Sequence, residues 1–335
     1  MSITIVKPGL FTTLQDAGRY GYQHLGVPVS GAMDIRAHRL ANLIAGNTQD
    51  QVTLECTLMG PTLTFAQACC IALSGADMDA HLNDQPIPNN RPIIIRAGDT
   101  LSLKQARHGV RTYVAVYGGF ACDPVMGSAS TYVRGGFGGY DGRALQAGDT
   151  LSLPTPLAND AKLDALSEQL WDQQIYLPAP WVQQVKTAVR AIQGPQAALF
   201  TKQAVDAFFS ADYRIDPQSD RMGYRLTGPT LALAEPTQIL SEAASFGSIQ
   251  VPADGQPIVL MADRQTTGGY PKIAHVCTVD LPHIAQAAPG QTLSFKPISL
   301  EDAQQLDEQR EHAYLTIAAD LAASRALIHN AGSQK

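Results

Sequence analysis

The sequence lacks several features that mark whole classes of protein. Its 335 residues contain no run of about 18 uninterrupted apolar residues, so we expect no membrane-spanning helix. The N-terminal segment has no charged stretch followed by an apolar stretch and a cleavage site, and we therefore expect a cytoplasmic protein. The formal net charge of -6 comes without a cluster of Lys and Arg, which argues against binding to nucleic acid.

Cysteine patterns and cofactor motifs are also scarce. The five cysteines are odd in number and none has C-x-x-C spacing, which indicates reduced, buried thiols rather than disulfides or a zinc site. The histidines are scattered without the spacing of metal ligands, so we expect no metal. Neither a G-x-x-x-x-G-K-[ST] motif nor a Met-Lys-Met biotin attachment motif occurs. We therefore expect ATP or biotin, if either is used, to act through another chain.

The sequence is rich in the turn-forming residues that separate short strands, with 28 Gly and 21 Pro. Residues 111–119 and 256–263 are rich in β-branched and aromatic side chains and predict strands. Four short signals recur in the same order in both halves, which indicates a duplicated domain. They begin at Gly60 and Gly228, Leu73 and Leu240, Asn83 and Asp254, and Gly98 and Gly290. We therefore predict a mainly β protein with two barrels, each closed or nearly closed.

Helices are expected to be few. Apolar periodicity predicts one over residues 33–47, beginning at Ser30 or Asp34 and ending at Gly46. Further helices are predicted within 160–174 and 199–209, and from Ser299 onward, where Ser299 and Asp302 form a capping-box pattern. The predicted domains are a first barrel at 1–155, a linker with a short helix at 156–180, a second barrel at 181–298 and a helical tail at 299–335.

One segment of the second half is unusually polar for a barrel. The stretch between the third and fourth repeat signals is more than twice as long there as in the first half, and it contains "DRQTTGGYPKIAHV". An insertion that is dense in polar groups is typical of a binding site, whereas the alternative is a plain hairpin extension.

This segment offers side chains suited to a planar, anionic small molecule. Arg264 presents a planar fork that matches a carboxylate, and Gln265 donates and accepts as an amide or lactam ring requires. Tyr270 is predicted as a proton donor and Lys272 as an electrostatic clamp, with a surface or partner-facing loop as the alternative. Further substrate contacts are predicted from hydroxyls and backbone N–H groups: Thr266, Thr267, Gly268 and Gly269.

A glycine-punctuated loop near the N-terminus is a second candidate site. Asp16 is predicted as a base and Arg19 as a carboxylate ligand, with Gln15 beside them; alternatively Asp16 and Arg19 pair and fix the loop. Glu55 lies in an apolar, strand-like run, so its carboxylate must be paired or line a cavity. The sequence "GGFGG" at 135–139 predicts a turn. Its charged neighbours either close a site or form structural ion pairs: Arg134, Asp141 and Arg143.

Four segments together resemble the biotin-dependent carboxyltransferase family, which is also called KipA-type or allophanate hydrolase subunit 2. They are residues 8–34, 127–149, 219–226 and 254–276, within a resemblance that covers about residues 3–300. The resemblance implies tandem cyclophilin-like β-barrels with a few helices and a C-terminal helix.

Within that family, the sequence is most similar to the stand-alone bacterial members of 5-oxoprolinase type. The resemblance implies a C subunit of an ATP-dependent 5-oxoprolinase, which cleaves 5-oxoproline to L-glutamate together with A-type and B-type subunits and is inactive without them. ATP would act through the assembled complex. Two alternatives stay open: a component of a urea carboxylase-like carboxyltransferase, with biotin carried by another chain, or a KipA-type regulatory protein that binds a kinase-inhibitor partner.

Overall fold

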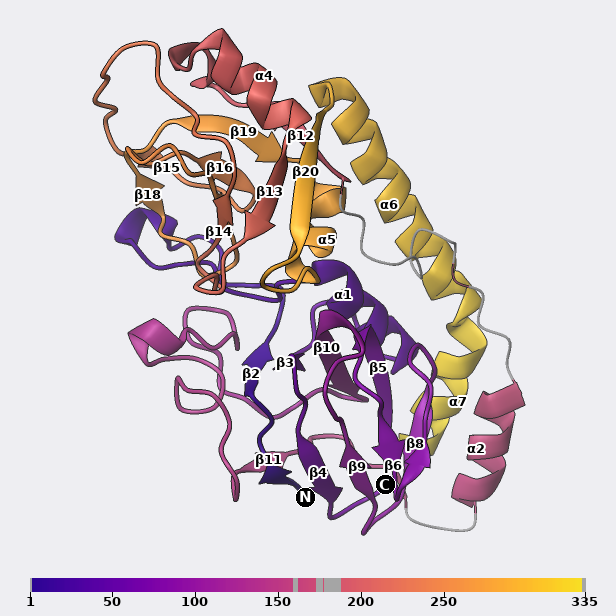
Figure 1. Cartoon of the computed structure of the whole chain (residues 1–335). Helices are drawn as coiled ribbons and strands as arrows, with labels where there is room; N and C mark the ends of the chain where they lie inside the picture. Colours follow the sequence, from indigo (N-terminus) through magenta and orange to yellow (C-terminus); the bar gives the residue numbers. More distant parts are fainter. Residues whose placement is uncertain (1, 159–161, 173–176, 178–187, 333–335) are drawn as a thin grey trace. The chain divides into compact units, whose positions relative to one another are not determined.

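The computed structural model describes residues 2–158, 162–172, 177 and 188–332, and Figure 1 traces the chain. The chain divides into two compact units, each assembled from separate stretches of sequence. The first unit comprises Met1–Arg19, Asp34–Gln184 and His312–Lys335, and the second comprises Tyr20–Met33 and Val185–Glu311. No helix within the described ranges is both long and apolar enough to cross a membrane.

The first unit contains two antiparallel sheets. One has six strands in the order β11-β1-β4-β9-β6-β7, and the other has five in the order β2-β3-β10-β5-β8. The strands of the first sheet are β1 (Ser2–Lys7), β4 (Thr62–Phe65), β6 (His81–Leu82), β7 (Gln85–Pro86), β9 (Thr100–Ser102) and β11 (Thr150–Ser152). Those of the second are β2 (Phe11–Gln15), β3 (Thr53–Thr57), β5 (Cys69–Asp77), β8 (Ile93–Ile95) and β10 (His108–Val116).

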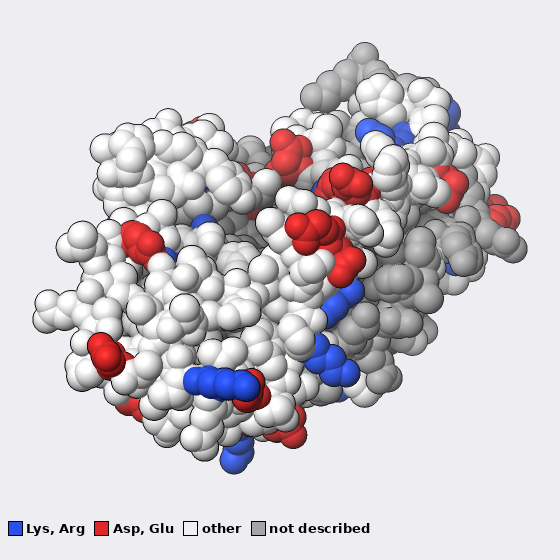
Figure 2. Space-filling model, turned by 90° about the horizontal axis from the view of Figure 1, so that it is seen from above, with Lys and Arg blue, Asp and Glu red and all other residues white. Residues whose placement is uncertain are grey.

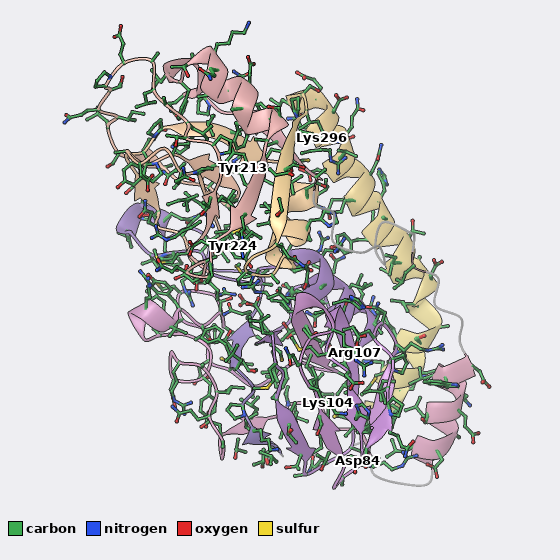
Figure 3. The ribbon with its side chains drawn as sticks, in the orientation of Figure 1. Asp84, Lys104, Arg107, Tyr213, Tyr224 and Lys296 are labelled. Carbon is green, nitrogen blue, oxygen red and sulfur yellow. The ribbon has the colours of Figure 1, made fainter. Side chains whose placement is uncertain are left out.

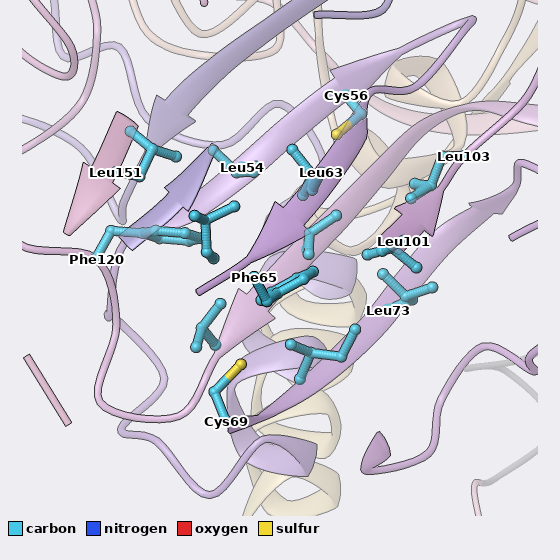
Figure 4. Close-up of a cluster of buried hydrophobic side chains, with 14 of the residues drawn as sticks. Leu54, Cys56, Leu63, Phe65, Cys69, Leu73, Leu101, Leu103, Phe120 and Leu151 are labelled. Atoms are coloured by element: carbon cyan, nitrogen blue, oxygen red, sulfur yellow. The ribbon is translucent and has the colours of Figure 1, made fainter. Parts of the chain in front are cut away.

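The core of the first unit is formed by side chains that alternate along these strands. Leu54 and Cys56 of β3 belong to the apolar cluster that Figure 4 displays, together with side chains such as Phe65 and Leu73. Because successive strand residues point to opposite faces, Thr53 and Glu55 face away from this core. The five-stranded sheet therefore has a second buried face, which is polar around β3, whereas Cys70 of β5 and Ile94 of β8 join an apolar cluster there.

Helix α1 (Ile35–Ile44) packs against β5 and β10 of that sheet. Asp34 is its N-cap, and the carboxylate of this residue accepts a 3.0 Å hydrogen bond from the Ala37 N–H. Gly46, just beyond the helix, has a φ of 88°. The helix predicted over 33–47 is thereby confirmed, with Asp34 rather than Ser30 as its start.

Two further helices of the first unit pack on each other. Helices α2 (Lys162–Asp172) and α7 (Ala322–Gly332) share an apolar cluster that includes Leu166, Leu170 and Ile328. The helix predicted within 160–174 is present, although residues 160, 161, 173 and 174 lie outside the described residues, as do parts of the predicted 156–180 linker. The domain boundaries stay a prediction.

The second unit contains a closed barrel of seven strands in the order β12-β19-β16-β17-β14-β13-β20. Neighbouring strands pair antiparallel throughout, except that β12 and β20 are parallel. The strands are β12 (Ala188–Gln193), β13 (Asp212–Ile215), β14 (Gly223–Thr227), β16 (Ser248–Gln250), β17 (Ile258–Leu260), β19 (Lys272–Val276) and β20 (Thr292–Pro297). A separate two-stranded sheet pairs β15 (Glu242–Ala243) with β18 (Thr267–Gly268). The mainly β architecture predicted from sequence is confirmed.

Aromatic side chains fill much of the second core. Figure 3 labels Tyr213 and Tyr224 on the neighbouring strands β13 and β14, and both are buried. Phe208 of helix α4 (Lys202–Ser210) stacks on Phe295 of β20 with ring centroids 4.7 Å apart. Met33, from the N-terminal quarter of the chain, belongs to the same core.

The helices predicted within 199–209 and from Ser299 onward are present, and each begins at a side-chain cap. Thr201 caps α4 by accepting from the Ala204 N–H at 3.1 Å. Ser299 caps α6 (Leu300–Asp320) by accepting from the Asp302 N–H at 3.0 Å. The shorter helices are α5 (Leu281–Ala285), η1 (Gln23–Leu25), η2 (Val133–Gly135), η3 (Ala197–Leu199) and η4 (Thr278–Asp280).

One strand prediction needs correction. The strand predicted over 256–263 is only β17, because the chain turns at Ala262 and Asp263. The repeat is not exact in the structure, because the first repeat signal forms β4 in the first half, whereas in the second half Leu233 makes only an isolated bridge with Phe200. The extra length in the second half is not a plain hairpin extension either, since it supplies β18, the barrel strand β19 and α5.

Candidate functional site

The Asp16 carboxylate organises a loop of the first unit. It accepts hydrogen bonds from the N–H groups of Gly18 and Ala129, at 2.8 and 2.7 Å. It also accepts from the hydroxyls of Ser128 and Ser130, at 2.7 and 2.5 Å. A carboxylate that accepts this many donors fixes the loop it belongs to. These contacts fit a structural role for Asp16 in the loop, made with hydroxyl and backbone donors, and its role as a base stays a prediction.

Arg19 is fully buried in the same region. Its guanidinium donates to the backbone carbonyls of Val125, Ser128 and Ser130, at 2.8, 3.2 and 2.9 Å, and lies 4.9 Å from the ring centroid of Phe137. Gly138, with a φ of 74°, passes so close that a Cβ would lie 2.1 Å from the Ser130 carbonyl oxygen. Arg19 thus ties two sequence motifs together, and its role as a carboxylate ligand stays a prediction.

Glu55 lies in a polar network on the second face of the five-stranded sheet. Its carboxylate accepts a 2.7 Å hydrogen bond from the Tyr113 hydroxyl and forms an ion pair with Arg111 at 3.7 Å. The Tyr113 oxygen in turn accepts from the Asp34 N–H at 2.7 Å. Burial raises the pKa of Tyr113 well above its usual value, and the neighbouring Glu55 charge raises it further. Glu55 is paired, as its burial requires.

Gln15 and His38 extend this network. The Gln15 amide donates to the Thr13 hydroxyl at 3.0 Å and to the Thr131 carbonyl at 3.2 Å. The His38 Nδ1 atom lies 2.9 Å from the Thr53 hydroxyl. Complete burial lowers the pKa of His38 to about 4, despite nearby carboxylates that raise it. At neutral pH the imidazole is therefore uncharged.

Arg264 is the most distinctive cation of the second unit. The side chain is half-buried, and its guanidinium donates to the carbonyls of Ala244, Met261 and Ala262, at 3.1, 3.4 and 3.5 Å. Burial lowers the pKa of Arg264. No carboxylate in the described part of the chain forms an ion pair with it. A half-buried cation without an ion-paired carboxylate is a suitable anchor for an anionic ligand.

The neighbouring carboxylate is already occupied. Asp263 accepts a two-pronged pair of hydrogen bonds from Arg221, at 2.9 and 3.2 Å. Arg221 also donates to the Gly31 carbonyl at 2.6 Å. The segments around residues 31, 221 and 263 therefore meet in the second unit. Three of the four segments that carry the family resemblance are thus brought together by the fold, although they are far apart in sequence.

Sequence reasoning missed a set of hydroxyls and an imidazole beside Arg264. Ser245 and Ser248 have their hydroxyl oxygens 2.9 Å apart, and the Ser248 oxygen lies 3.4 Å from Nδ1 of His275. Burial lowers the pKa of His275, and the positive charge of Arg264 lowers it further. The only sequence signal is the short "SFGS" stretch before β16, whose Gly247 at a φ of 89° makes the turn.

Lys272 is predicted as a clamp, but its ammonium is engaged by Glu242. The side chain of Lys272 is only 6% exposed and forms an ion pair and a short hydrogen bond with that carboxylate. Glu242 also accepts from the Gln196 amide at 2.7 Å, and its pKa is lowered chiefly by the hydrogen bond from Lys272. A role for Lys272 in substrate binding stays a prediction.

The other predicted residues of this segment surround the β15–β18 sheet. Gly268 is buried, and a Cβ there would lie 2.6 Å from the Gln250 amide nitrogen and 2.8 Å from that of Gln265. Tyr270 is 48% exposed, and the Thr266 carbonyl accepts from the Ala244 N–H at 2.9 Å. The exposed members of this segment are Gln265, Thr267, Gly269 and Tyr270. Of the predicted set, the fold brings Arg264, Gln265 and Lys272 to the same hairpin region, where Lys272 is ion-paired.

The "GGFGG" stretch forms turns, as predicted, with Gly136, Gly138 and Gly139 at positive φ. Of its charged neighbours, Arg143 forms a two-pronged ion pair with Asp149, at 2.7 and 2.8 Å. Arg134 lies on η2. The described residues contain no group of three or more His, Cys, Asp or Glu arranged to hold a metal. On the face that Figure 2 displays, acidic and basic side chains are interspersed without a continuous basic stripe.

Comparisons with known proteins agree with this architecture. The chain is 37% identical over 316 residues to the 5-oxoprolinase C subunit of Escherichia coli (strain K12), covering 94% of this chain and 97% of the relative. It is 38% identical over 299 residues to the 5-oxoprolinase C subunit of Haemophilus influenzae, covering 89% of this chain and 92% of the relative. The crystal structure of the K. lactis urea amidolyase superposes with a TM-score of 0.84 at 31% identity, over 94% of this chain but only 20% of that larger one. Residues 25–297 match the family described as "Carboxyltransferase domain, subdomain A and B". The chain belongs to this carboxyltransferase-domain family.

Proposed function

We propose that the chain is the C subunit of an ATP-dependent 5-oxoprolinase, which cleaves 5-oxoproline to L-glutamate together with A-type and B-type subunits. The observation that carries the proposal is the extent of the match to the E. coli 5-oxoprolinase C subunit, which includes 97% of that protein. The match to yeast urea amidolyase includes only 17% of the relative. The match thus covers nearly the whole 5-oxoprolinase C subunit but only a small part of the much longer urea amidolyase.

The chemistry of the second unit supports a small carboxylate as the ligand. The Arg264 guanidinium is half-buried and has no carboxylate partner among the described residues, so an anion would supply the missing counter-charge. The exposed Gln265 amide nearby offers both a donor and an acceptor to a lactam ring. 5-Oxoproline combines these two groups, since it is a lactam that carries a carboxylate.

ATP and the remaining catalytic groups enter through the complex. The sequence has no Walker-type motif, and the proposal assigns nucleotide binding to the assembled A-type, B-type and C-type chains. It also locates the complex in the cytoplasm, in keeping with five cysteines that are all free thiols.

A second candidate is biotin-dependent carboxyl transfer. The TM-score of 0.84 with the Kluyveromyces lactis urea carboxylase favours it, and the same Arg264 anchor suits a carboxylated ligand. Biotin would then arrive on another chain, because this sequence has no attachment motif.

Reconstitution distinguishes the two candidates. The purified chain is mixed with A-type and B-type subunits, and ATP hydrolysis and glutamate formation are measured with and without 5-oxoproline. The proposal expects 5-oxoproline-dependent activity in the full mixture and none when this chain is omitted. Activity that persists without this chain would refute the proposal. Biotin-dependent carboxylation with a biotin-carrying chain would favour the second candidate instead.

A further inference from the structure

The turn that leads into β16 brings two serine hydroxyls together. The Ser248 N–H donates to the Ser245 carbonyl at 3.1 Å, which closes the turn, and Gly247 takes a φ of 89° that only glycine adopts without strain. The two hydroxyl oxygens lie 2.9 Å apart. Ser245 is exposed, whereas Ser248 is buried. The turn thus connects an accessible hydroxyl to an inaccessible one.

The buried hydroxyl continues to an imidazole on the next strand. Ser248 is the register partner of His275 on β19, and its oxygen lies 3.4 Å from Nδ1 of that histidine. This distance is long for a hydrogen bond, as is common for catalytic contacts before substrate binds. The strands concerned, β16 and β19, are neighbours in the barrel of Figure 1. The path from solvent therefore ends on a histidine that is mostly buried.

The charges around His275 determine when it can hold a proton. Ser248 from β16 and Arg264 from the loop after β17 face the imidazole, and the paired strand β12 contributes the apolar Ile192 at this register. Burial, and to a smaller extent the positive charge of Arg264, lowers the pKa of His275, so the unliganded imidazole is neutral and able to accept a proton. An anion bound at Arg264 would offset that charge and make the imidazolium less unfavourable.

Arg264 also holds the start of the path in place. Its Nε atom donates to the carbonyl of Ala244, the residue immediately before Ser245, at 3.1 Å. One guanidinium therefore both fixes the serine turn and sets the charge beside the histidine. The ligand anchor and the hydroxyl chain form one connected structure.

We propose that Ser245, Ser248 and His275 form a proton relay that serves a carboxylate-bearing lactam held at Arg264. This role rests on the proposed function, whose net reaction couples the hydrolysis of ATP, supplied through the complex, to the addition of water across the C–N bond of the lactam. As the water oxygen bonds to the ring carbonyl carbon, the carbonyl π electrons move to the carbonyl oxygen. One water proton passes to Ser245, the Ser245 proton passes to Ser248, and the Ser248 proton passes to Nδ1 of His275. The electron pair on the carbonyl oxygen then re-forms the C=O bond as the C–N bond breaks, the C–N bond pair stays on nitrogen, and the same chain returns that proton to this nitrogen.

In this scheme Ser245 is the catalytic residue that contacts the reacting water, and Ser248 and His275 act through it. The relay requires a neutral imidazole that carries its hydrogen on Nε2, so that Nδ1 accepts. It also requires that His275 gain proton affinity when an anion occupies the site. Both requirements are measurable in the chain without its partner subunits.

The first test uses nitrogen-15 NMR of the histidines in the purified full chain, with and without 5-oxoproline. We expect the Nε2–H tautomer at His275 and an increase in its pKa when 5-oxoproline is added, and we expect the increase to vanish in Arg264→Gln. A Nδ1–H tautomer, or a pKa that does not respond to 5-oxoproline, would overturn the relay. This test stands even where the reconstituted mixture has no activity, an outcome that would count against the proposed function alone.

The second test measures turnover in the reconstituted complex. We expect Ser245→Ala, Ser248→Ala and His275→Gln each to lower kcat by about 100-fold, with KM nearly constant, and to remove the loss of kcat/KM at acid pH that protonation of the base causes. Ser241→Ala, which alters an exposed serine on the same segment, is the matched control and should match the wild type. The relay would be disproved if the wild type is active and the Ser248 and His275 variants keep both its turnover and its loss of kcat/KM at acid pH. The proposed function would then remain intact.

Discussion

The hydroxyl of Tyr113 donates a 2.7 Å hydrogen bond to Glu55 on the adjacent strand, inside the first unit. Neither side chain is exposed to solvent. Because the same oxygen accepts the N–H of Asp34, one phenol connects β3, β10 and the start of α1. The sheet face opposite the apolar core is therefore held by directed polar contacts.

Removing that hydroxyl should destabilise the protein. Tyr113→Phe leaves the Glu55 carboxylate without its closest donor, and we expect a loss of about 1–3 kcal/mol in the free energy of unfolding. Urea denaturation followed by circular dichroism measures it. Tyr20→Phe, at a tyrosine that is 67% exposed, is the control. Equal losses in the two variants would show that the buried hydrogen bond contributes nothing specific.

Two arginines of the second unit should respond in opposite ways to neutralisation. Arg221→Gln leaves Asp263 buried without its partner, so we expect a loss of about 3–5 kcal/mol in stability. Arg264→Gln leaves no buried carboxylate behind, and we expect a smaller loss, about 1–2 kcal/mol, but a fall of about tenfold or more in kcat/KM of the reconstituted complex. Thermal unfolding and turnover are measured for both. A larger loss of stability in Arg264→Gln than in Arg221→Gln would argue that Arg264 is structural.

Replacing the Asp16 carboxylate should lower the stability of the fold. Asp16→Asn replaces an acceptor of four donors by an amide whose NH₂ group faces donors, so we expect a loss of about 2–3 kcal/mol. Asp141→Asn, at an exposed turn position with a φ of 51°, is the control because asparagine tolerates that conformation. A variant with wild-type stability and abolished turnover would restore the prediction that Asp16 is a base.

His38 should make stability depend on pH in the mildly acidic range. Its pKa in the folded chain is lowered, mainly by burial, to about 4, below the ordinary value of 6.5. The unfolded chain therefore binds a proton there that the folded chain does not. Stability is complete above pH 6.5 and falls by about 3 kcal/mol as the pH is lowered toward 4.

Denaturation curves at a series of pH values measure this effect. His38→Gln keeps a polar partner for Thr53 and should flatten the dependence between pH 6.5 and 4, whereas the exposed His24→Gln should not. The same slope in His38→Gln as in the wild type would mean that other groups cause the acid sensitivity.

Local signals are sufficient to predict much of the fold. The N-cap pattern at Asp34 and the capping box at Ser299 mark helix starts correctly, because caps depend on neighbours within one turn. The strand predicted to run to Asp263 is wrong, because its end depends on a turn that Arg221 stabilises from a distant part of the sequence. Periodicity has no information about such a partner.

The candidate site is less accessible to sequence reasoning. Arg264 could be predicted because a guanidinium suits an anionic ligand. The structure shows that this residue is half-buried and forms no ion pair with a carboxylate among the described residues. The same chemistry points to Arg19, but its Nε and one terminal nitrogen donate to carbonyls more than 100 positions away in sequence. His275 has no comparable signal, because only the pairing of β16 with β19 brings it to Ser248.

The burial of most cysteine thiols offers a way to measure whether the chain is folded. Four of the five thiols, those of Cys56, Cys69, Cys70 and Cys277, are buried, and burial raises their pKa values, so alkylating reagents should modify the native chain at Cys122 first. The mass added by iodoacetamide would then report the number of accessible thiols: one adduct is expected for the folded chain and five for the unfolded chain. Every variant discussed above can be screened this way without any assay of turnover.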